Sequence, residues 1–359
     1  MNFRVLLPFL GLLISLSLCA QPESGMQVIA GHDPRIEASG AWFSHRNGDT
    51  IEYSRFSPEI FAAASGETFA ADKARTTAGV LLRFTTDSPV INVVFKILPG
   101  ERRGLTLAVS ENGAIFETLN PSHENDTVKV GWDSHTPREV STFDVLLPHW
   151  SNLGLHEIQI SSGAELLENP QSHRPHYVAI GDSITHGTGL PSPTQTWPWQ
   201  LAQSRNWSLT NLAVGGSKVV PQLAAMTAGQ EIDVFTVLIG YNDWNKGTTE
   251  VDYRNKLSAL VEGLRAHHPK AHINCLPPLA ARKGEEGPHV QSGTTLESYR
   301  DVVRTLVRDR RANGDSQIFV IETKDIFAVS DTRDGVHPSI AGAEKLARHL
   351  AASLVSPQP

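Results

Sequence analysis

The chain has 359 residues, with 31 Lys and Arg against 38 Asp and Glu, and its formal net charge is −7. The length suggests two domains, and 40% hydrophobic residues with 7 Trp supply two cores, which excludes wholesale disorder. A mildly acidic chain without a long basic run is not expected to bind nucleic acid. The two cysteines, Cys19 and Cys275, exclude a disulfide framework and a cysteine-based metal site. The apolar context of Cys275 predicts a buried thiol.

Residues 1–20 have the pattern of a secretory signal peptide, because Arg4 precedes a long apolar run and small residues and a polar segment follow. The apolar run is too short for a membrane span. We therefore expect cleavage after Ala20 or Cys19, and a secreted or periplasmic chain without stable membrane insertion. The alternative is a lipoprotein acylated at Cys19, which Leu18 disfavours because a small residue normally precedes the acylated cysteine.

From about residue 25 to 168, apolar residues alternate with polar ones, which is the period of half-buried strands. Turn signals separate the predicted strands, and Asn112-Gly113 is the best hairpin turn among them. The other turn signals are Asp87-Ser88-Pro89, Pro99-Gly100 and Asn152-Leu153-Gly154. No helix is predicted within this series. The pattern indicates an antiparallel β-sandwich.

A polar segment with two prolines, residues 168–175, marks the predicted domain boundary. Beyond it the pattern changes to strands that alternate with helices. Strands are predicted at 176–180, 234–239 and 318–321, and helices around 257–264, 299–306 and 340–350. This alternation predicts a mostly parallel, doubly wound α/β sheet over residues 174–355, with ligands bound outside the carboxyl ends of its strands.

Four segments at predicted strand ends or loops contain the parts of a serine acyl-transfer site. Ser183 lies on a tight strand-to-helix turn and is the candidate nucleophile, with His337 as the base and Asp334 as the group that orients the imidazole. The backbone N–H groups of Ser183 and Gly216 and the side-chain amide of Asn242 are the candidate donors of an oxyanion hole. Each segment alone has an ordinary explanation as a helix cap, turn or loop, and only their joint occurrence indicates chemistry.

These segments resemble, residue by residue, the four motif blocks of the SGNH hydrolases, also called the GDSL esterase/lipase superfamily. Ser183 matches the first block, Gly216 the second, Asn242 the third, and Asp334 with His337 the fourth. The resemblance implies a flavodoxin-like α/β/α fold, ester hydrolysis through an acyl-enzyme, and no metal or organic cofactor. The N-terminal half resembles, by pattern alone, the jelly-roll domain of two-domain bacterial carbohydrate esterases, including acetylxylan esterase-like enzymes.

The expected substrate is an acylated carbohydrate or another small ester, and the predicted reaction removes small acyl groups, O-acetyl above all, from a poly- or oligosaccharide. Trp197, Tyr241 and Trp244 are candidate contacts to sugar rings, with core packing as the alternative. A general short-chain esterase or lysophospholipase-like GDSL lipase is the enzymatic alternative. A non-catalytic glycan-binding protein is the alternative from another class.

Two further features have alternative interpretations. His186, close to Ser183 in sequence, either lines the pocket or is a solvated loop imidazole. The N-terminal domain either holds substrate or covers an apolar face of the catalytic domain. The oligomeric state is not predicted from the sequence.

Overall fold

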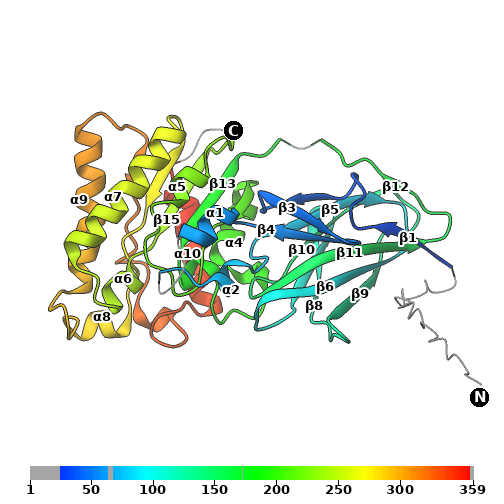
Figure 1. The fold of residues 1–359 in the computed structure, drawn as a ribbon, viewed down its shortest axis with the longest axis horizontal. Helices are drawn as coiled ribbons and strands as arrows, with labels where there is room; N and C mark the ends of the chain where they lie inside the picture. The colour runs from blue at the N-terminus through cyan, green and yellow to red at the C-terminus, as the bar shows by residue number, and fades with distance from the viewer. Residues whose placement is uncertain (1–24, 64–67, 172, 356–359) are drawn as a thin grey trace, which may run out of the picture.

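The structure is a computed structural model, and it describes residues 25–63, 68–171 and 173–355. The predicted signal peptide and its lipoprotein alternative at Cys19 lie outside these residues. Among the described residues, no helix is both long enough and apolar enough to cross a membrane. A strand-rich half and a half that mixes helices with strands lie end to end along the long axis of the molecule (Figure 1).

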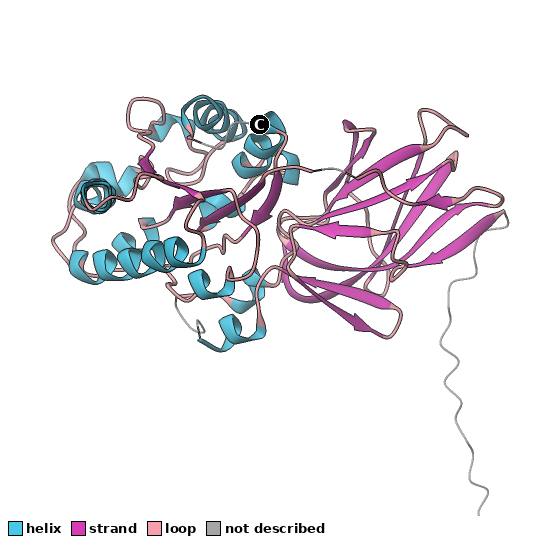
Figure 2. Cartoon of the chain, turned by 90° about the horizontal axis from the view of Figure 1, so that it is seen from above, coloured by secondary structure: helices cyan, strands magenta, loops and turns pink. Residues whose placement is uncertain are grey.

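The strand-rich half is a sandwich of two antiparallel sheets, called here the sandwich half (Figure 2). One sheet has the order β3-β4-β11-β6-β9, with β1 paired to β11, and the other has the order β12-β5-β10-β7-β8, with β2 paired to β5. The inner faces of both sheets bury one apolar core. The strands are β1 Met26–Ala30, β2 Glu37–Ser39, β3 Phe43–Asn47, β4 Thr50–Ser54, β5 Leu81–Thr86, β6 Val90–Arg102, β7 Leu107–Glu111, β8 Ala114–Leu119, β9 Thr127–Asp133, β10 Ser141–Leu146, β11 Ser151–Ser161 and β12 Leu166–Leu167.

The predicted turns have mixed outcomes. Asn112 and Gly113 join β7 to β8 with φ angles of 51° and 85°, as a two-residue hairpin turn requires, so this prediction is confirmed. Pro99-Gly100 and Asn152-Leu153-Gly154 lie inside β6 and β11, so their prediction as turns is wrong. These residues occupy an irregular stretch of the β6–β11 pair, where the Asn152 side-chain amide donates to the Pro99 carbonyl at 2.8 Å. Gly and Pro mark a bulged strand here rather than a chain reversal.

The other half, called here the α/β half, is built on five parallel strands in the order β14-β13-β15-β16-β17. Helices cover both faces of this sheet, so the predicted fold class is confirmed (Figure 2). The strands are β13 His176–Gly181, β14 Ser208–Asn211, β15 Val234–Leu238, β16 His272–Cys275 and β17 Ile318–Val320. The helices are α3 Ser183–His186, α4 Trp197–Arg205, α5 Leu223–Met226, α6 Tyr241–Asn245, α7 Glu250–His267, α8 Arg282–Glu286, α9 Leu296–Ala312 and α10 Ile340–Ser353, with short 3₁₀ turns at Pro193–Gln195 and Val329–Asp331.

The three longest helices each begin at a hydroxyl side chain. Thr249, Thr295 and Ser339 accept hydrogen bonds from backbone N–H groups in the first turns of α7, α9 and α10. Such caps satisfy N–H groups that the helix itself leaves without a partner. The apolar stripe of each helix then faces the sheet. Cys275, on β16, is buried between the sheet and its helices as a free thiol, as predicted.

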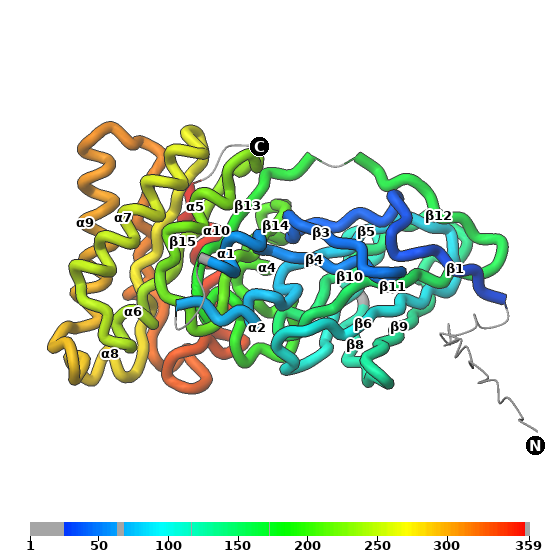
Figure 3. Tube along the Cα trace, viewed as in Figure 1, coloured from blue at the N-terminus to red at the C-terminus, as the bar shows by residue number. Residues whose placement is uncertain are grey.

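Two short helices interrupt the sandwich half, so the prediction of a series without helices is wrong. They are α1 Pro58–Ala63 and α2 Ala71–Ala74, and they belong to a segment called here the arm, residues 55–63 and 68–76. The arm leaves the sandwich after β4 and lies against the α/β half (Figure 3). Its buried residues Phe56, Ile60, Phe69 and Ala74 belong to one apolar cluster with residues of the parallel sheet and its helices. Helices of six and four residues are too short to give a periodic signal in the sequence.

Candidate active site

Ser183 is the first residue of α3 and directly follows the turn after β13. The turn is held by Asp182, whose carboxylate Oδ1 accepts the Ile184 N–H at 3.0 Å and caps the helix. Asp334 and His337 lie on the loop before α10. The fold therefore brings together two segments that are 154 residues apart in the sequence.

A continuous hydrogen-bonded chain joins the three predicted catalytic side chains. His337 Nε2 lies 2.9 Å from Ser183 Oγ, and His337 Nδ1 lies 2.8 Å from Asp334 Oδ2. Because a carboxylate only accepts, it selects the tautomer with the proton on Nδ1, which leaves Nε2 free to accept the serine proton. The other carboxylate oxygen of Asp334 accepts the N–H groups of Val336 and His337 at 3.0 and 2.8 Å. Burial raises the pKa of Asp334, but these hydrogen bonds outweigh it and hold the pKa below its usual value.

Two backbone N–H groups next to this chain have no acceptor. Within the described residues, neither Ser183 nor Gly216 donates its N–H to any protein atom, whereas the N–H groups of Gly215 and Ser217 are both bonded. Gly216 has a φ of +83°, a conformation that a residue with a side chain adopts only with strain. Unpaired donors at a protein surface formed by such a turn suit an oxyanion.

Asn242, the third predicted oxyanion donor, is buried and already bonded. Its Nδ2 donates to Asp182 Oδ2 at 3.2 Å and to the Ser217 carbonyl at 3.1 Å, which uses both amide protons. An oxyanion at this position would share one of these protons with Ser217. Ser183 and Gly216 are therefore the predicted oxyanion donors whose N–H groups are unpaired. The Asn242 side chain links Asp182 to Ser217, the residue that follows Gly216.

Two carboxylates are buried beneath the site. Burial is the main cause that raises the pKa of Asp182 to about 7, and the nearby Asp243 charge adds to it, while hydrogen bonds from Ile184 and Asn242 oppose it. Burial also raises the pKa of Asp243 to about 6, against a hydrogen bond from the Val219 N–H. A carboxyl group with such a pKa exchanges its proton close to neutral pH.

His186 is fully buried, so its interpretation as a solvated loop imidazole is wrong. Its ring is stacked on Trp150 of the sandwich half, with the two ring centroids 4.0 Å apart. The sequence offered no sign of this, because Trp150 and His186 come from different halves of the chain. Arg55, at the start of the arm, was missed for the same reason, although it is 1% exposed and contacts the last residue of β14 and the segment after it.

The predicted aromatic substrate contacts are largely excluded by burial. Trp197 and Trp244 are 1% and 2% exposed and belong to the two apolar clusters of the α/β half, so their prediction as sugar contacts is wrong. Core packing, the alternative interpretation, accounts for both. Tyr241 is 7% exposed, and it lies close enough to Asp334 for that carboxylate to raise its pKa, after burial as the larger cause. Tyr241 stays a predicted substrate contact.

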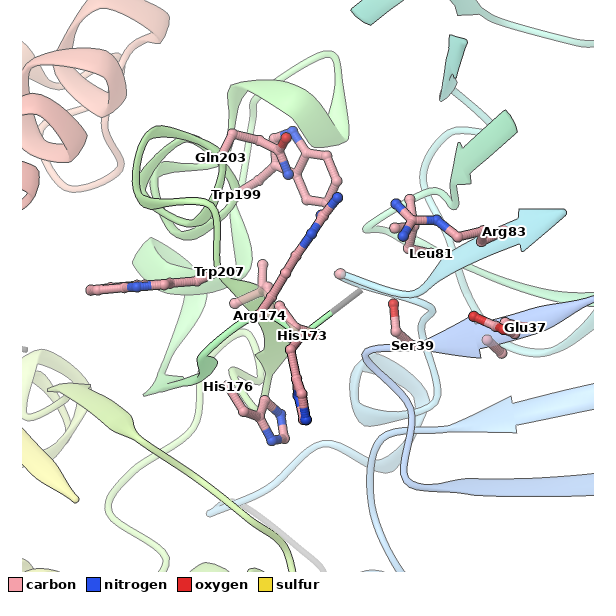
Figure 4. Close-up of a pocket in the computed structure, with 14 residues that line it drawn as sticks. Glu37, Ser39, Leu81, Arg83, His173, Arg174, His176, Trp199, Gln203 and Trp207 are labelled. Carbon is pink, nitrogen blue, oxygen red and sulfur yellow. The ribbon is translucent and has the colours of Figure 1, made fainter. Parts of the chain in front are cut away.

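Two cavities lie at the junction of the halves. One, of about 330 Å³, is lined by His176, Trp199 and Trp207 (Figure 4). It lies at the N-terminal end of β13, whereas Ser183 follows the C-terminal end of this strand. The other, of about 460 Å³, is lined by Trp150 and by Thr188, whose N–H donates to the Ser183 carbonyl. The second cavity is therefore the one beside the serine turn. In the part of the chain that the structure describes, no three His, Cys, Asp or Glu side chains are grouped as metal ligands.

A parallel α/β sheet with a hydrogen-bonded serine, histidine and aspartate at the carboxyl ends of its strands is an arrangement of serine hydrolases. Residues 179–345, which make up most of the α/β half, match the model of the GDSL-like lipase/acylhydrolase family. The sequence resemblance to SGNH hydrolases is thereby confirmed.

The chain is similar in sequence to a curated protein and in fold to solved structures. The chain is 27% identical over 189 residues to "Cellulase/esterase CelE" of Acetivibrio thermocellus, a match that covers 52% of this chain and 20% of that protein. The salicylyl-acyltransferase SsfX3 from a tetracycline biosynthetic pathway has a TM-score of 0.80 at 23% identity, covering 91% of this chain and 96% of the other. A family two carbohydrate esterase from Cellvibrio japonicus has a TM-score of 0.64 at 15% identity, covering 91% of this chain and 96% of the other. Because each structural similarity covers 91% of this chain, the fold of both halves has a counterpart in these two structures.

Proposed function

We propose that this protein is an exported serine esterase that removes O-acetyl groups from a poly- or oligosaccharide. The observation that carries the proposal is the hydrogen-bonded chain from Ser183 through His337 to Asp334, next to the unpaired N–H groups of Ser183 and Gly216. Acyl transfer needs a nucleophile, a base, a group that orients the base and donors for the oxyanion, and these residues supply all four.

The proposed reaction has two steps with the same residues. Ser183 Oγ attacks the ester carbonyl while His337 Nε2 takes its proton, and the negative charge on the carbonyl oxygen is held by the two N–H groups. His337 then returns the proton to the leaving sugar oxygen, and an acetyl-serine remains. A water molecule, deprotonated by His337, then attacks the acetyl carbonyl. The bond to Ser183 Oγ breaks, His337 returns the proton to Oγ, and acetate leaves. Asp334 keeps the imidazole in the required tautomer throughout.

The carbohydrate part of the proposal is supported by the similarity to the cellulase/esterase and by the cavity beside the serine turn. That cavity offers Arg103, Thr106 and Asn120 as hydrogen-bonding groups. Polar groups around an open depression suit a hydrated sugar better than an acyl chain. A lysophospholipase would need an apolar channel at the same place.

The test measures acetate released from a panel of acetylated polysaccharides, alongside a series of p-nitrophenyl esters of increasing acyl length. The wild type is compared with Ser183→Ala and with Ser204→Ala, which removes an exposed hydroxyl on α4 as a matched control. We expect acetate from at least one glycan, a loss of about 10⁴-fold or more in Ser183→Ala, and wild-type rates in Ser204→Ala.

The other outcomes each contradict a part of the proposal. Turnover of simple esters alone would remove the carbohydrate assignment, and a preference for long acyl chains would favour the lipase alternative. A wild type that binds glycan but releases no acetate would favour the glycan-binding alternative. Export is tested by the mass of the mature protein recovered outside the cytoplasm, since a start at residue 21 without acylation supports cleavage after Ala20.

A further inference from the structure

The segment that carries Gly216 is attached to the sandwich half at its start. This segment, called here the oxyanion loop, comprises residues 211–217. Arg55 of the arm donates from one terminal nitrogen to the carbonyls of Asn211 and Ala213 at 2.6 and 2.9 Å. Among the described residues, its remaining donors bond to arm atoms alone, namely the carbonyls of Lys73, Ala74 and Thr76 and the Thr76 hydroxyl. No carboxylate is among these partners, so the buried cation is stabilised by carbonyl oxygens of both halves.

The middle of the oxyanion loop is held by His186. The N–H of Gly215, the residue before Gly216, points at His186 Nδ1 at 3.2 Å. Trp150 lies over the same turn, because a Cβ on Gly215 would lie 2.5 Å from the Trp150 ring. The peptide that precedes the Gly216 N–H is therefore fixed by one hydrogen bond and one ring.

The sandwich half determines the tautomer of His186. Nε2 lies 2.7 Å from the His149 carbonyl, which only accepts, and 2.9 Å from the Thr76 hydroxyl. The proton must therefore be on Nε2, and Nδ1 is left as the acceptor for Gly215. Burial and the neighbouring Arg55 charge both lower the pKa of His186 well below its usual value, so the ring stays neutral and Nδ1 keeps its lone pair.

We infer that His186 is a positioning residue for ester hydrolysis, through which Thr76 and His149 of the sandwich half orient the Gly215–Gly216 turn toward the oxyanion. The inference rests on the serine site of the proposed function and adds to it a task for the sandwich half. His186 does not touch substrate and transfers no proton. It acts by keeping the Gly216 N–H in place before the charge develops, which is where such donors gain their effect.

Two substitutions separate the two nitrogens of His186. In His186→Asn, the side-chain oxygen takes the place of Nδ1 and still accepts from Gly215, whereas the contacts to the His149 carbonyl and the Thr76 hydroxyl are lost. In His186→Gln, the terminal amide takes the place of Nε2 and still donates to His149, whereas Gly215 loses its acceptor. His186→Gln loses one hydrogen bond and His186→Asn loses two contacts, so thermal unfolding is expected to shift at least as much in His186→Asn as in His186→Gln.

The experiment measures kcat and KM for p-nitrophenyl acetate and the inhibition constant of phenylboronic acid, whose serine adduct places a charged oxygen at the oxyanion position. We expect His186→Gln to lower kcat about tenfold or more with little change in KM, since loss of a whole oxyanion donor costs about 10²- to 10³-fold. The inhibition constant should rise in parallel. His186→Asn should keep a kcat about fivefold or more above that of His186→Gln.

A second pair of variants avoids the buried ring. Thr76→Val removes the hydroxyl that bridges Arg55 and His186, and Thr76→Ser keeps it. We expect a lower kcat at constant KM in the valine variant, restored in the serine variant. Equal losses in both His186 variants, or no loss in His186→Gln and Thr76→Val, would overturn the inference while the serine site stands. A wild type inert toward the ester would instead overturn the proposed serine site and this inference with it.

Discussion

The two halves of the molecule differ in what they contribute to the site. The α/β half holds every side chain of the hydrogen-bonded chain, and its segments meet because parallel strands end at one edge of the sheet. The sandwich half holds none of them, yet its arm and the His149–Trp150 segment are in contact with the loop that carries Gly216. A region without reacting groups is thus built into the candidate active site.

The largest expected effect concerns the α/β half alone. Asp334→Asn should lower kcat about 10³-fold, because the amide presents a proton to His337 Nδ1 and selects the tautomer whose Nε2 cannot accept from Ser183. Asp331→Asn is the control, since Asp331 lies on the same loop and pairs with Lys345 instead. The measurement is kcat for p-nitrophenyl acetate. Similar rates in the two variants would contradict the assigned task of Asp334.

A smaller effect tests the junction of the halves. Arg55→Met should lower the free energy of unfolding by about 3 kcal/mol, because several buried carbonyls lose their donor. The value of kcat should fall as well, because the oxyanion loop loses its hydrogen bonds to the arm. Arg83→Met removes a partly buried pair with Asp144 inside the sandwich and should destabilise without lowering kcat. If both variants lower kcat equally, general destabilisation explains the loss and the junction has no special part in it.

The smallest effect is a dependence of stability on pH. The folded pKa of Asp243, about 6, is higher than its pKa in the unfolded chain. The folded chain therefore holds this proton up to a higher pH than the unfolded chain does, and the free energy of unfolding falls as pH rises from about 4 through 6. Asp243→Asn removes this loss. Buried histidines act in the opposite direction, so the quantity to follow is the difference in unfolding free energy between the variant and the wild type.

This difference should move in favour of Asp243→Asn by about 1 kcal/mol between pH 5 and pH 8. Asp325→Asn, which alters an exposed acid, should show a constant difference across the same range. Chemical denaturation at several pH values supplies both curves. A constant difference for Asp243→Asn as well would mean that its pKa is not raised.

Local patterns in the sequence were enough to predict much of the fold and the centre of the site. The alternation of apolar residues predicted the sandwich, and the motif segments predicted that Ser183, Asp334 and His337 meet. Predictions failed where the secondary structure or the burial of a residue depends on segments that are distant in the sequence. Asn152 has the composition of a turn residue, but pairing of its segment with β6 makes it part of a strand. Trp244 stands next to motif residues in the sequence, and the fold turns it into the core.

The buried guanidinium of Arg55 also constrains the order in which the chain folds during synthesis. The carbonyls of Asn211 and Ala213 that it binds are 156 and 158 residues further along the chain. A ribosome adding about 5–20 residues per second delivers them about 8 to 32 s after Arg55. Until then the sandwich half has an arm whose apolar side chains and cation lack their partners, so its final folding step must wait for the α/β half to emerge.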